Sequence, residues 1–211
     1  MKTIIYILRH GESESNKTGT FTGSNEVDLS ELGLKQAEIA GEYLKDKGIE
    51  FIYSSPLSRA VKTAEPTSKK IGLPIVCDER FREVHFGSWE GKTKEYLAKN
   101  EPDFLLWRAH PALISANNGE NSLEAAKRFA CGLYDIAKRH AGSTLLVTAH
   151  GGVILDCMCY LGFYNKETAT IDNISRNAGI TKLVYDGEKF DMEFYGYDGY
   201  LGESKAELKL V

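Results

Sequence analysis

Short apolar runs rich in β-branched residues alternate with amphipathic helical patterns along most of this chain. Because each run is only a few residues long, it predicts a buried strand rather than a helix. Strands that alternate with helices form mainly parallel sheets whose two faces are both covered. The sequence therefore predicts an α/β fold, a three-layer sandwich around a mainly parallel sheet. The expected buried strands are Ile4–Leu8, Phe51–Tyr53, Ile75–Val76 and Leu145–Val147.

Several segments have the spacing and the end residues of helices. One begins after the capping residue Ser30, and another runs from Ser58 to Gly72, where Pro66 should kink it. The first helix carries an apolar stripe at steps of three and four residues, Leu34, Ala37, Gly41 and Leu44. A third helix, capped by Asn121 or Ser122, has Leu123, Ala126, Ala130, Leu133 and Ala137 on one face, and a fourth spans Gly151–Leu161.

The end of the pattern differs from the rest, because two apolar runs follow each other directly. Ile180–Tyr185 and Lys189–Phe194 flank Asp186-Gly187, a dipeptide typical of tight hairpin turns. We therefore expect an antiparallel hairpin near the C-terminus.

Composition limits the function classes. The length of 211 residues fits one domain over 1–211, and 42% apolar with 27% charged residues excludes disordered and coiled-coil classes. A net charge of −4 argues against nucleic-acid and anionic-membrane partners. Without a signal peptide or an apolar run of about 20 residues, we expect a cytoplasmic protein. The cysteines are then expected as reduced thiols: Cys77, Cys131, Cys157 and Cys159.

Three polar groups fall at or just beyond the ends of predicted strands, where ligands bind in parallel sheets. They are Arg9-His10-Gly11, Ser54-Ser55-Pro56 leading to Arg59, and His150-Gly151-Gly152. Gly11 should let a ligand approach the main chain, and Arg59, in the first turn of its helix, is well placed for an anion. Singly, each group is a common turn or surface feature.

Together with Glu83, these groups have the composition of a phosphoryl-transfer site. Two arginines and a histidine can neutralise a phosphoryl group, a second histidine can attack it, and a carboxyl group can protonate the departing oxygen. No cluster of His, Cys or Asp has metal-ligand spacing. We therefore expect a small phosphorylated metabolite as partner, and neither a metal nor another cofactor.

In these residues the chain resembles the histidine phosphatase superfamily, in its phosphoglycerate mutase-like branch. The matches run in family order from residue 4 to about residue 185, and the ordered series is far more specific than any one motif. The matching segments are Leu8-Arg9-His10-Gly11-Glu12-Ser13, Asn16, Phe21-Thr22-Gly23, Leu29-Ser30-Glu31-Leu32-Gly33, Ser54-Ser55-Pro56-Leu57-Ser58-Arg59-Ala60, Glu83, Phe86-Gly87-Ser88-Trp89-Glu90-Gly91 and Val147-Thr148-Ala149-His150-Gly151-Gly152.

The resemblance implies a phosphohistidine mechanism. His10 falls at the position of the nucleophile, and Glu83 at that of the proton donor. The remaining matches are Arg9, Arg59 and His150 at phosphate-binding positions, and Asn16, Thr22 and Gly23 at positions that contact the phosphate or the substrate.

The segment between Glu83 and the helix near Ser122 distinguishes the activities within the family. It is expected as a short helical cap, approximately residues 86–121, in which Trp89, Tyr96, Phe104, Leu105 and Trp107 pack over the pocket. The motif Phe86–Gly91 and the residues Asn173 and Asn177–Thr181 resemble the subgroup of α-ribazole and broad-specificity phosphatases. In the family that this chain resembles, the mutases have a longer insertion after the glutamate and a pair of arginines for a carboxylate. The cations in this segment are instead Lys92, Lys94, Lys99 and Arg108.

We therefore expect a metal-independent phosphomonoester hydrolase. Phosphoglycerate mutase-type transfer is the first alternative, and a non-catalytic phosphate-binding protein is the second. The tail 199–211 matches no known pattern, and a lid role of the kind that mutases give their tails stays open. The sequence predicts neither the substrate nor the oligomeric state.

Overall fold

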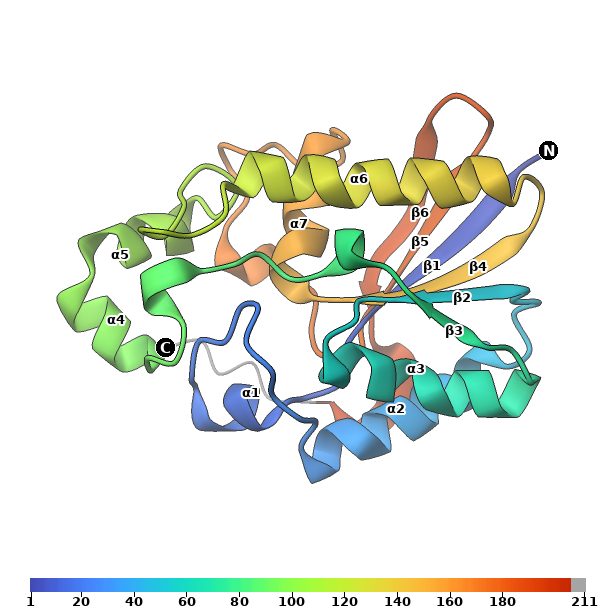
Figure 1. Cartoon of the computed structure of the whole chain (residues 1–211), viewed down its shortest axis with the longest axis horizontal. Coiled ribbons are helices and arrows are strands. Elements are labelled where there is room, and N and C mark those ends of the chain that lie inside the picture. The colour runs from blue at the N-terminus through green and yellow to red at the C-terminus, as the bar shows by residue number, and fades with distance from the viewer. Residues whose placement is uncertain (206–211) are drawn as a thin grey trace.

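A single mixed sheet runs through the computed structural model, which describes residues 1–205. Within these residues six strands follow the order β3-β2-β4-β1-β5-β6 (Figure 1). The β1–β4, β4–β2 and β2–β3 pairs are parallel, and β5 joins both β1 and β6 antiparallel. The predicted α/β class and the C-terminal hairpin are thus confirmed. The strands are β1 Thr3–Arg9, β2 Phe51–Ser54, β3 Ile75–Cys77, β4 Thr144–Ala149, β5 Ile180–Tyr185 and β6 Phe190–Tyr197.

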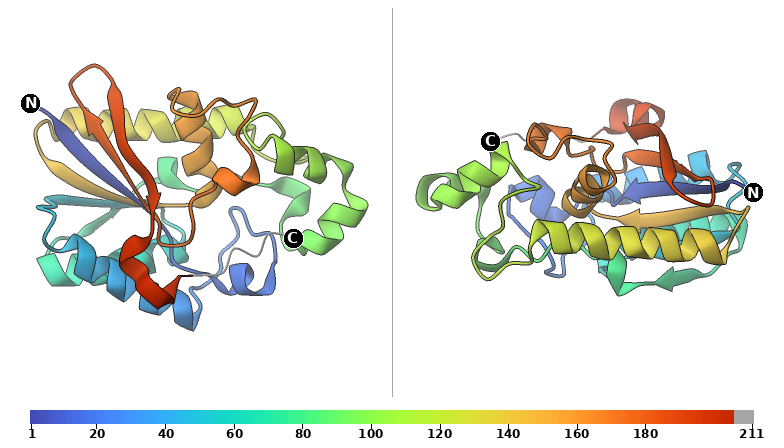
Figure 2. Two further views of the ribbon diagram at one scale, coloured as in Figure 1. Left: turned by 180° about the vertical axis from the view of Figure 1, so that it is seen from behind. Right: turned by 90° about the horizontal axis from the view of Figure 1, so that it is seen from above.

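Helices cover both faces of the sheet, with α2 and α3 on one side and α6 and α7 on the other (Figures 1 and 2). Alternation along β1 explains this, because Ile5 and Ile7 pack with the α6 and α7 side and Tyr6 and Leu8 with the α2 and α3 side. The helices are α1 Glu14–Thr18, α2 Glu31–Leu44, α3 Ser58–Ile71, α4 Lys94–Asn100, α5 Pro102–Ala109, α6 Ser122–Arg139 and α7 Gly151–Tyr160, with 3₁₀ turns at Glu79–Phe81, Gly87–Trp89, Ile171–Asn173 and Gly199–Ser204.

Two residues of the predicted apolar stripes do not face the core. Leu34 and Leu123 are each 50% exposed, so the predicted stripes were wrong at these positions. Gln36 is fully buried in α2 instead, because its amide accepts from Glu12 N–H at 2.8 Å and donates to Ser204 C=O at 2.9 Å. A polar side chain whose donor and acceptor are both hydrogen-bonded can take the place of an apolar one on the buried side of a helix.

The α4 and α5 helices lie at one end of the molecule, beyond the ends of the parallel strands (Figure 1). Phe104 and Trp107 of α5 are buried, and both pack edge-on against Phe21. Tyr96 and Leu105 were expected to pack here too, but they are 48% and 49% exposed, because they lie on the outer faces of these short helices. The domain limits 1–211 and the cap limits 86–121 stay predictions.

The C-terminal segment that the structure describes lies against α2. The rings of Tyr43 and Tyr200 are stacked with their centroids 4.7 Å apart, and the Tyr200 hydroxyl donates to Ala178 C=O. Of the tail 199–211, residues 206–211 lie outside the described residues. No helix within residues 1–205 is both long and apolar enough to cross a membrane. All four cysteines are free thiols.

Candidate active site

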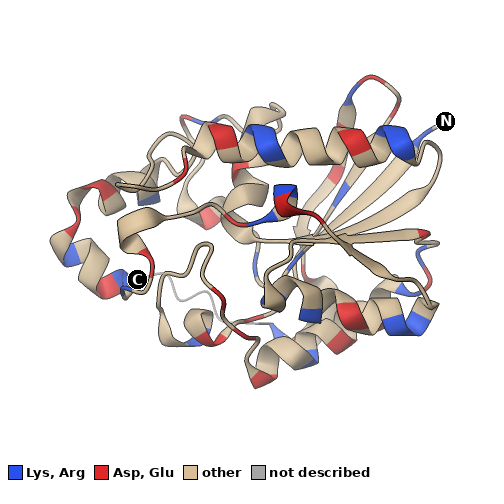
Figure 3. Cartoon of the chain, viewed as in Figure 1, with Lys and Arg blue, Asp and Glu red and all other residues tan. Residues whose placement is uncertain are grey.

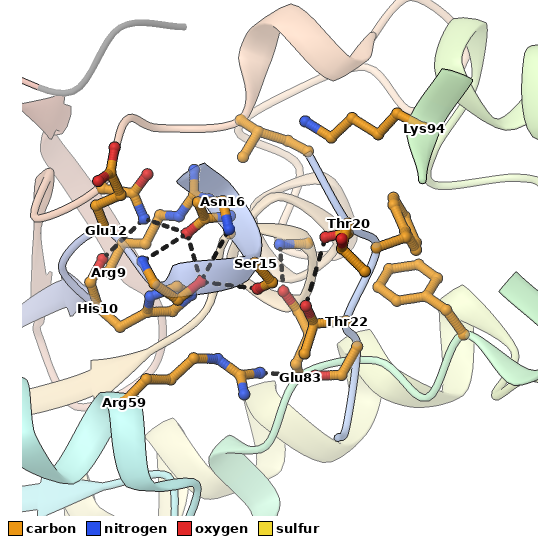
Figure 4. Close-up of a pocket in the computed structure, with 18 of the residues that line it drawn as sticks. Arg9, His10, Glu12, Ser15, Asn16, Thr20, Thr22, Arg59, Glu83 and Lys94 are labelled. Atoms are coloured by element: carbon orange, nitrogen blue, oxygen red, sulfur yellow. Dashed lines mark hydrogen bonds between the residues drawn. The ribbon is translucent and has the colours of Figure 1, made fainter. Parts of the chain in front are cut away.

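A pocket of about 150 Å³ lies at the carboxyl ends of β1 and β2 and at the start of α7 (Figure 4). This is the edge at which the sequence placed its three polar groups, and the position follows from parallel topology. Of the predicted site residues, seven line it: Arg9, His10, Asn16, Thr22, Gly23, Arg59 and Glu83.

His10 lies in a turn that is held by backbone hydrogen bonds on both sides. Its N–H donates to Ala149 C=O at 2.9 Å, and its C=O accepts from Ala178 N–H at 3.1 Å. The next residue, Gly11, does not leave room for a ligand as we had predicted. A Cβ there would stand 2.5 Å from Gly33 O, so the glycine instead allows α2 to pack against the turn.

The tautomer of His10 follows from its contact with Gly11 C=O, which lies 2.6 Å from Nδ1. A carbonyl oxygen only accepts, so Nδ1 carries the proton and Nε2 keeps a free lone pair. Burial, followed by the positive charges of Arg59 and Arg9, lowers the pKa of His10 well below its usual 6.5. The imidazole is therefore neutral at pH 7, with Nε2 available as a nucleophile.

The two arginines are fixed by backbone carbonyls, with Arg59 buried and Arg9 half-buried. Arg9 Nη1 donates to Ser175 C=O, while Arg59 donates from Nη1 to Asn25 C=O at 2.9 Å and from Nη2 to Gly23 C=O at 2.6 Å. Burial lowers the pKa of Arg59 to about 10, which still leaves it protonated at neutral pH. Both guanidinium groups are thus held as cations beside His10 before any ligand arrives.

His150 was predicted to lie beside His10 and the two arginines. Unlike them, it does not line the pocket. Its fully buried ring lies 5.2 Å from the His10 ring, and its Nε2 is 2.7 Å from Ser55 Oγ. Nδ1 of His150 is buried without a hydrogen-bond partner among residues 1–205. Burial, Arg59 and His10, in that order, lower the pKa of His150 well below 6.5, so this ring is also neutral.

Glu83 reaches the pocket from the loop between β3 and α4 and caps the start of α7. Its Oε2 accepts from Gly152 N–H at 3.0 Å, and its Oε1 accepts from Val153 N–H at 2.8 Å and Val84 N–H at 3.0 Å. Unpaired N–H groups at a helix start favour a carboxylate. Gly152 allows this contact, since a Cβ there would stand 2.9 Å from Glu83 Oε1.

Asn16 lies in α1, whereas Thr22 and Gly23 lie on the loop that follows it. Asn16 Oδ1 accepts from Ser13 N–H at 3.2 Å, whereas Thr22 makes only a long hydrogen bond to Thr20 C=O at 3.5 Å. Gly23 has a φ of +54° and its carbonyl holds Arg59. This left-handed conformation favours glycine, and it lets the loop turn toward the arginine.

The pocket also contains residues that the sequence did not assign to it. Lys94, at the start of α4, lies on the far side of the pocket from Arg9 and His10 (Figure 4). Arg176 and Asn177 precede β5 and line the pocket as well; Asn177 belongs to the match at Asn177–Thr181, whereas no sequence signal marked Arg176. Gly151, Gly152 and Trp107 line the pocket as expected, and the rest of the lining that we had not predicted is Glu12, Ser13, Ser15, Thr20, Phe21, Phe86, Ile171 and Ile174.

Outside the pocket, charges of both signs follow each other along the helices (Figure 3). Many form ion pairs within one turn, such as Lys69 with Glu65 on α3 and Arg139 with Asp135 on α6. The cations around His10 are therefore a local feature of the pocket. No three His, Cys, Asp or Glu side chains among residues 1–205 gather as a group that could hold a metal ion.

This fold and pocket define an α/β protein with a neutral histidine and two arginines at an anion-sized site. The model of the histidine phosphatase superfamily, branch 1, matches residues 5–198, and the chain belongs to this family. It is thus an enzyme of the histidine phosphatase type.

Known relatives include both phosphatases and mutases. A provisionally named phosphoserine phosphatase 2 of Hydrogenobacter thermophilus is 38% identical over 190 residues, covering 88% of this chain and 91% of its own. A 2,3-bisphosphoglycerate-dependent phosphoglycerate mutase of Nocardia farcinica is 34% identical over 79% of this chain and 80% of its own. The solved structure of Bacillus stearothermophilus YhfR has a TM-score of 0.85 at 30% identity, covering 94% of this chain and 99% of YhfR.

Proposed function

We propose that this protein is a metal-independent phosphomonoester hydrolase that works through a phosphohistidine on His10. The observation that carries the proposal is the state of His10, which is neutral, protonated on Nδ1 and flanked by the cations Arg9 and Arg59. A neutral imidazole with a fixed lone pair is a good nucleophile for phosphorus, and fixed cations stabilise the charge on the phosphoryl oxygens.

In the first step, His10 Nε2 attacks the phosphorus atom and the bond between phosphorus and the ester oxygen breaks. Glu83, in its protonated form, gives its proton to that oxygen, so that an alcohol leaves. Arg9, Arg59 and the Nδ1–H of His150 hold the phosphoryl oxygens. The pairing of the ring supports this role, because Ser55 Oγ lies 2.7 Å from Nε2 of His150 and leaves Nδ1 as the ring nitrogen without a partner among residues 1–205.

In the second step, water attacks the phosphorus atom of the phosphohistidine and the phosphorus–nitrogen bond breaks. The Glu83 carboxylate takes a proton from this water, and inorganic phosphate leaves with the imidazole restored. Both steps balance without an oxidant, a reductant or a metal ion. The charge stabilisation comes entirely from groups of the chain.

The far side of the pocket selects the leaving group. Phe86 and Trp107 supply an apolar wall, and Lys94 and Arg176 supply positive charge. A small phosphorylated metabolite with a second acidic group, such as phosphoserine, fits this combination, and the name of the 38%-identical relative points the same way. An α-ribazole or broad-specificity phosphatase would instead accept neutral leaving groups. The cytoplasmic location stays a prediction.

Mutase activity is the second candidate, because a phosphoglycerate mutase is among the relatives. Of the four cap cations named above, only Lys94 lines the pocket, while Lys92 pairs with Glu101 and Lys99 with Glu95. This cap therefore lacks the paired arginines of a mutase, which favours hydrolysis. Non-catalytic phosphate binding is the least favoured reading, since His10 and Glu83 both line the pocket.

A panel of phosphomonoesters, measured as kcat/KM with and without a strong chelator, tests the proposal. We expect release of inorganic phosphate that the chelator does not change, and the highest kcat/KM for phosphorylated carboxylic acids. Activity lost on chelation and restored by Mg²⁺ or Zn²⁺ would contradict metal independence. Transfer of phosphate between glycerate positions faster than its release would establish the mutase, and no turnover of any ester would leave a binding protein.

A further inference from the structure

Asn177 is a buried amide beside the nucleophile that the reaction as written does not use. It lines the pocket, is 8% exposed, and precedes Ala178, whose φ of +55° turns the chain toward His10. Its Nδ2 lies 3.2 Å from His10 O, 3.2 Å from Gly11 O and 3.0 Å from Asn16 Oδ1. All three neighbours are oxygens that only accept, so the nitrogen of the amide must face them.

The orientation of the Asn16 amide follows in the same way. Its Oδ1 receives the Ser13 N–H at 3.2 Å, and a backbone N–H can only donate. Asn177 Nδ2 donates to the same oxygen. The Asn16 Nδ2, which makes no hydrogen bond within residues 1–205, is thereby left as a donor for the pocket that Asn16 lines.

The carbonyl oxygen of Gly11, one of the three acceptors, connects Asn177 to the nucleophile His10. Gly11 C=O also accepts from His10 Nδ1, the bond that fixes the tautomer of His10. A hydrogen bond from Asn177 Nδ2 to this carbonyl holds it in place opposite the imidazole. The Asn177 side chain thus acts on two groups of the site: it helps to orient Nδ2 of Asn16, and it supports the tautomer of the His10 imidazole.

We propose that Asn177 is a positioning residue of the phosphate site, because together with Ser13 it holds Oδ1 of the Asn16 amide so that Nδ2 faces the phosphoryl group. Asn177 itself does not contact the phosphate in this arrangement. The inference rests on the proposed function for its assay, and binding of inorganic vanadate and phosphate tests it independently of turnover.

The experiment is a double-mutant cycle between Asn16→Ala and Asn177→Ala, with kcat/KM for p-nitrophenyl phosphate and the Kd of vanadate as readouts. A hydrogen bond to a charged oxygen contributes about 10- to 100-fold, so each single variant should lose that much in both readouts. Because both residues act through one donor, the double variant should be no worse than Asn16→Ala. Losses that multiply would overturn the proposal.

Two further variants separate positioning from folding. Asn177→Asp keeps the size of the side chain but removes the donor and places a buried carboxyl group against three acceptor oxygens, so kcat/KM should fall at least as far as in Asn177→Ala and Tm should fall as well, with the assays run well below that Tm. Asn100→Ala removes an exposed amide that donates to Tyr96 C=O at 2.8 Å outside the pocket, and it should keep wild-type kcat/KM. An Asn177→Asp variant with wild-type kcat/KM would contradict the inference.

A measurement on the unaltered protein decides the case if the variants do not fold. Vanadate should shift the NMR signals of the Asn16 side-chain amide protons and leave those of Asn177 nearly unchanged. The reverse result would make Asn177 the direct ligand and would overturn the proposal. A wild-type protein that binds vanadate but hydrolyses no ester would contradict the phosphatase function and leave the assignment of Asn177 intact.

Discussion

The Glu83 carboxylate and the backbone of Gly152 fit together with no space for a side chain. Oε2 accepts the Gly152 N–H at 3.0 Å, and a Cβ on that residue would stand 2.9 Å from Oε1. The first turn of α7 therefore places the proposed proton donor, and the glycine allows the contact.

Gly152→Ala should displace the Glu83 carboxyl by a few tenths of an ångström or more while the phosphate pocket stays in place. Misplacing a reacting group by about 1 Å can cost up to ~100-fold in rate, and we expect kcat on an alkyl phosphate to fall toward that limit. The Kd of vanadate is the internal control and should change little. A large loss of vanadate affinity with kcat unchanged would show that the new methyl group blocks the anion site.

Glu83→Gln removes the proton and keeps the shape. An alkoxide needs a proton to leave and nitrophenolate does not, so kcat should fall by about 10²- to 10⁴-fold on an alkyl phosphate and far less on p-nitrophenyl phosphate. Glu120→Gln is the matched control, because Glu120 pairs with Arg128 and does not line the pocket. Equal losses on both substrates would assign Glu83 to positioning, and Glu12, which lines the pocket, would be the next carboxyl to test.

His10→Ala should abolish turnover, with kcat at least about 1000-fold lower, because the nucleophile is gone. A brief reaction with labelled substrate and an alkaline quench should leave acid-labile label on the wild type only. His85→Ala provides the control, since His85 is exposed and outside the pocket, and it should label normally. Label on His10→Ala would move the nucleophile elsewhere, first to His150.

The part of the site that motifs describe was predictable, and the part built from distant segments was not. Arg9, His10 and Arg59 lie at the ends of regular elements whose patterns are local, whereas Glu83 was assigned through the family resemblance; all four line one pocket. Asn177 reaches its three acceptors across more than 160 residues of sequence, and no local pattern carries that information. These contacts depend on β5 joining β1 antiparallel.

The prediction of which helix faces are buried failed in part for a related reason. Periodicity identifies a face only when burial follows hydrophobicity, and Gln36 breaks that rule by bonding Glu12 and Ser204 on either side of α2. The stripe was therefore assigned to Leu34, which is half exposed. Buried polar residues become predictable only when their partners are known, and these partners come from the two ends of the chain.

The acid limb of the pH–rate profile should lie below pH 6.5. Burial, Arg59 and Arg9 lower the pKa of His10, so the nucleophile stays neutral, and activity falls only when the pH drops through that lowered value. Arg59→Met removes one of these charges, raises the pKa of His10 and should move the limb of kcat/KM to higher pH. The second ionisation of the phosphate ester, near a pH of about 6, is common to both enzymes and cancels in the comparison. A limb that does not move would mean that Arg59 has no electrostatic effect on His10.

Asp156→Asn should stabilise the fold at neutral pH. Asp156 is 5% exposed in α7, and burial, followed by the negative charges of Glu83 and Glu120, raises its pKa well above 3.8. The folded state therefore keeps a proton that the unfolded chain releases above a pH of about 4, and stability falls as the pH rises from there. Asparagine is neutral at every pH and removes this cost. The free energy of unfolding at pH 7 should rise by about 1 kcal/mol, since one pKa unit is worth about 1.4 kcal/mol.

Urea unfolding at pH 4, 5.5 and 7 measures the difference in stability between Asp156→Asn and the wild type, which should vanish toward pH 4. Asp46→Asn, at an exposed position, should show no such trend. A variant that loses stability at pH 7 but not at pH 4 would mean that the Asp156 carboxylate is ionised and paired in the folded protein.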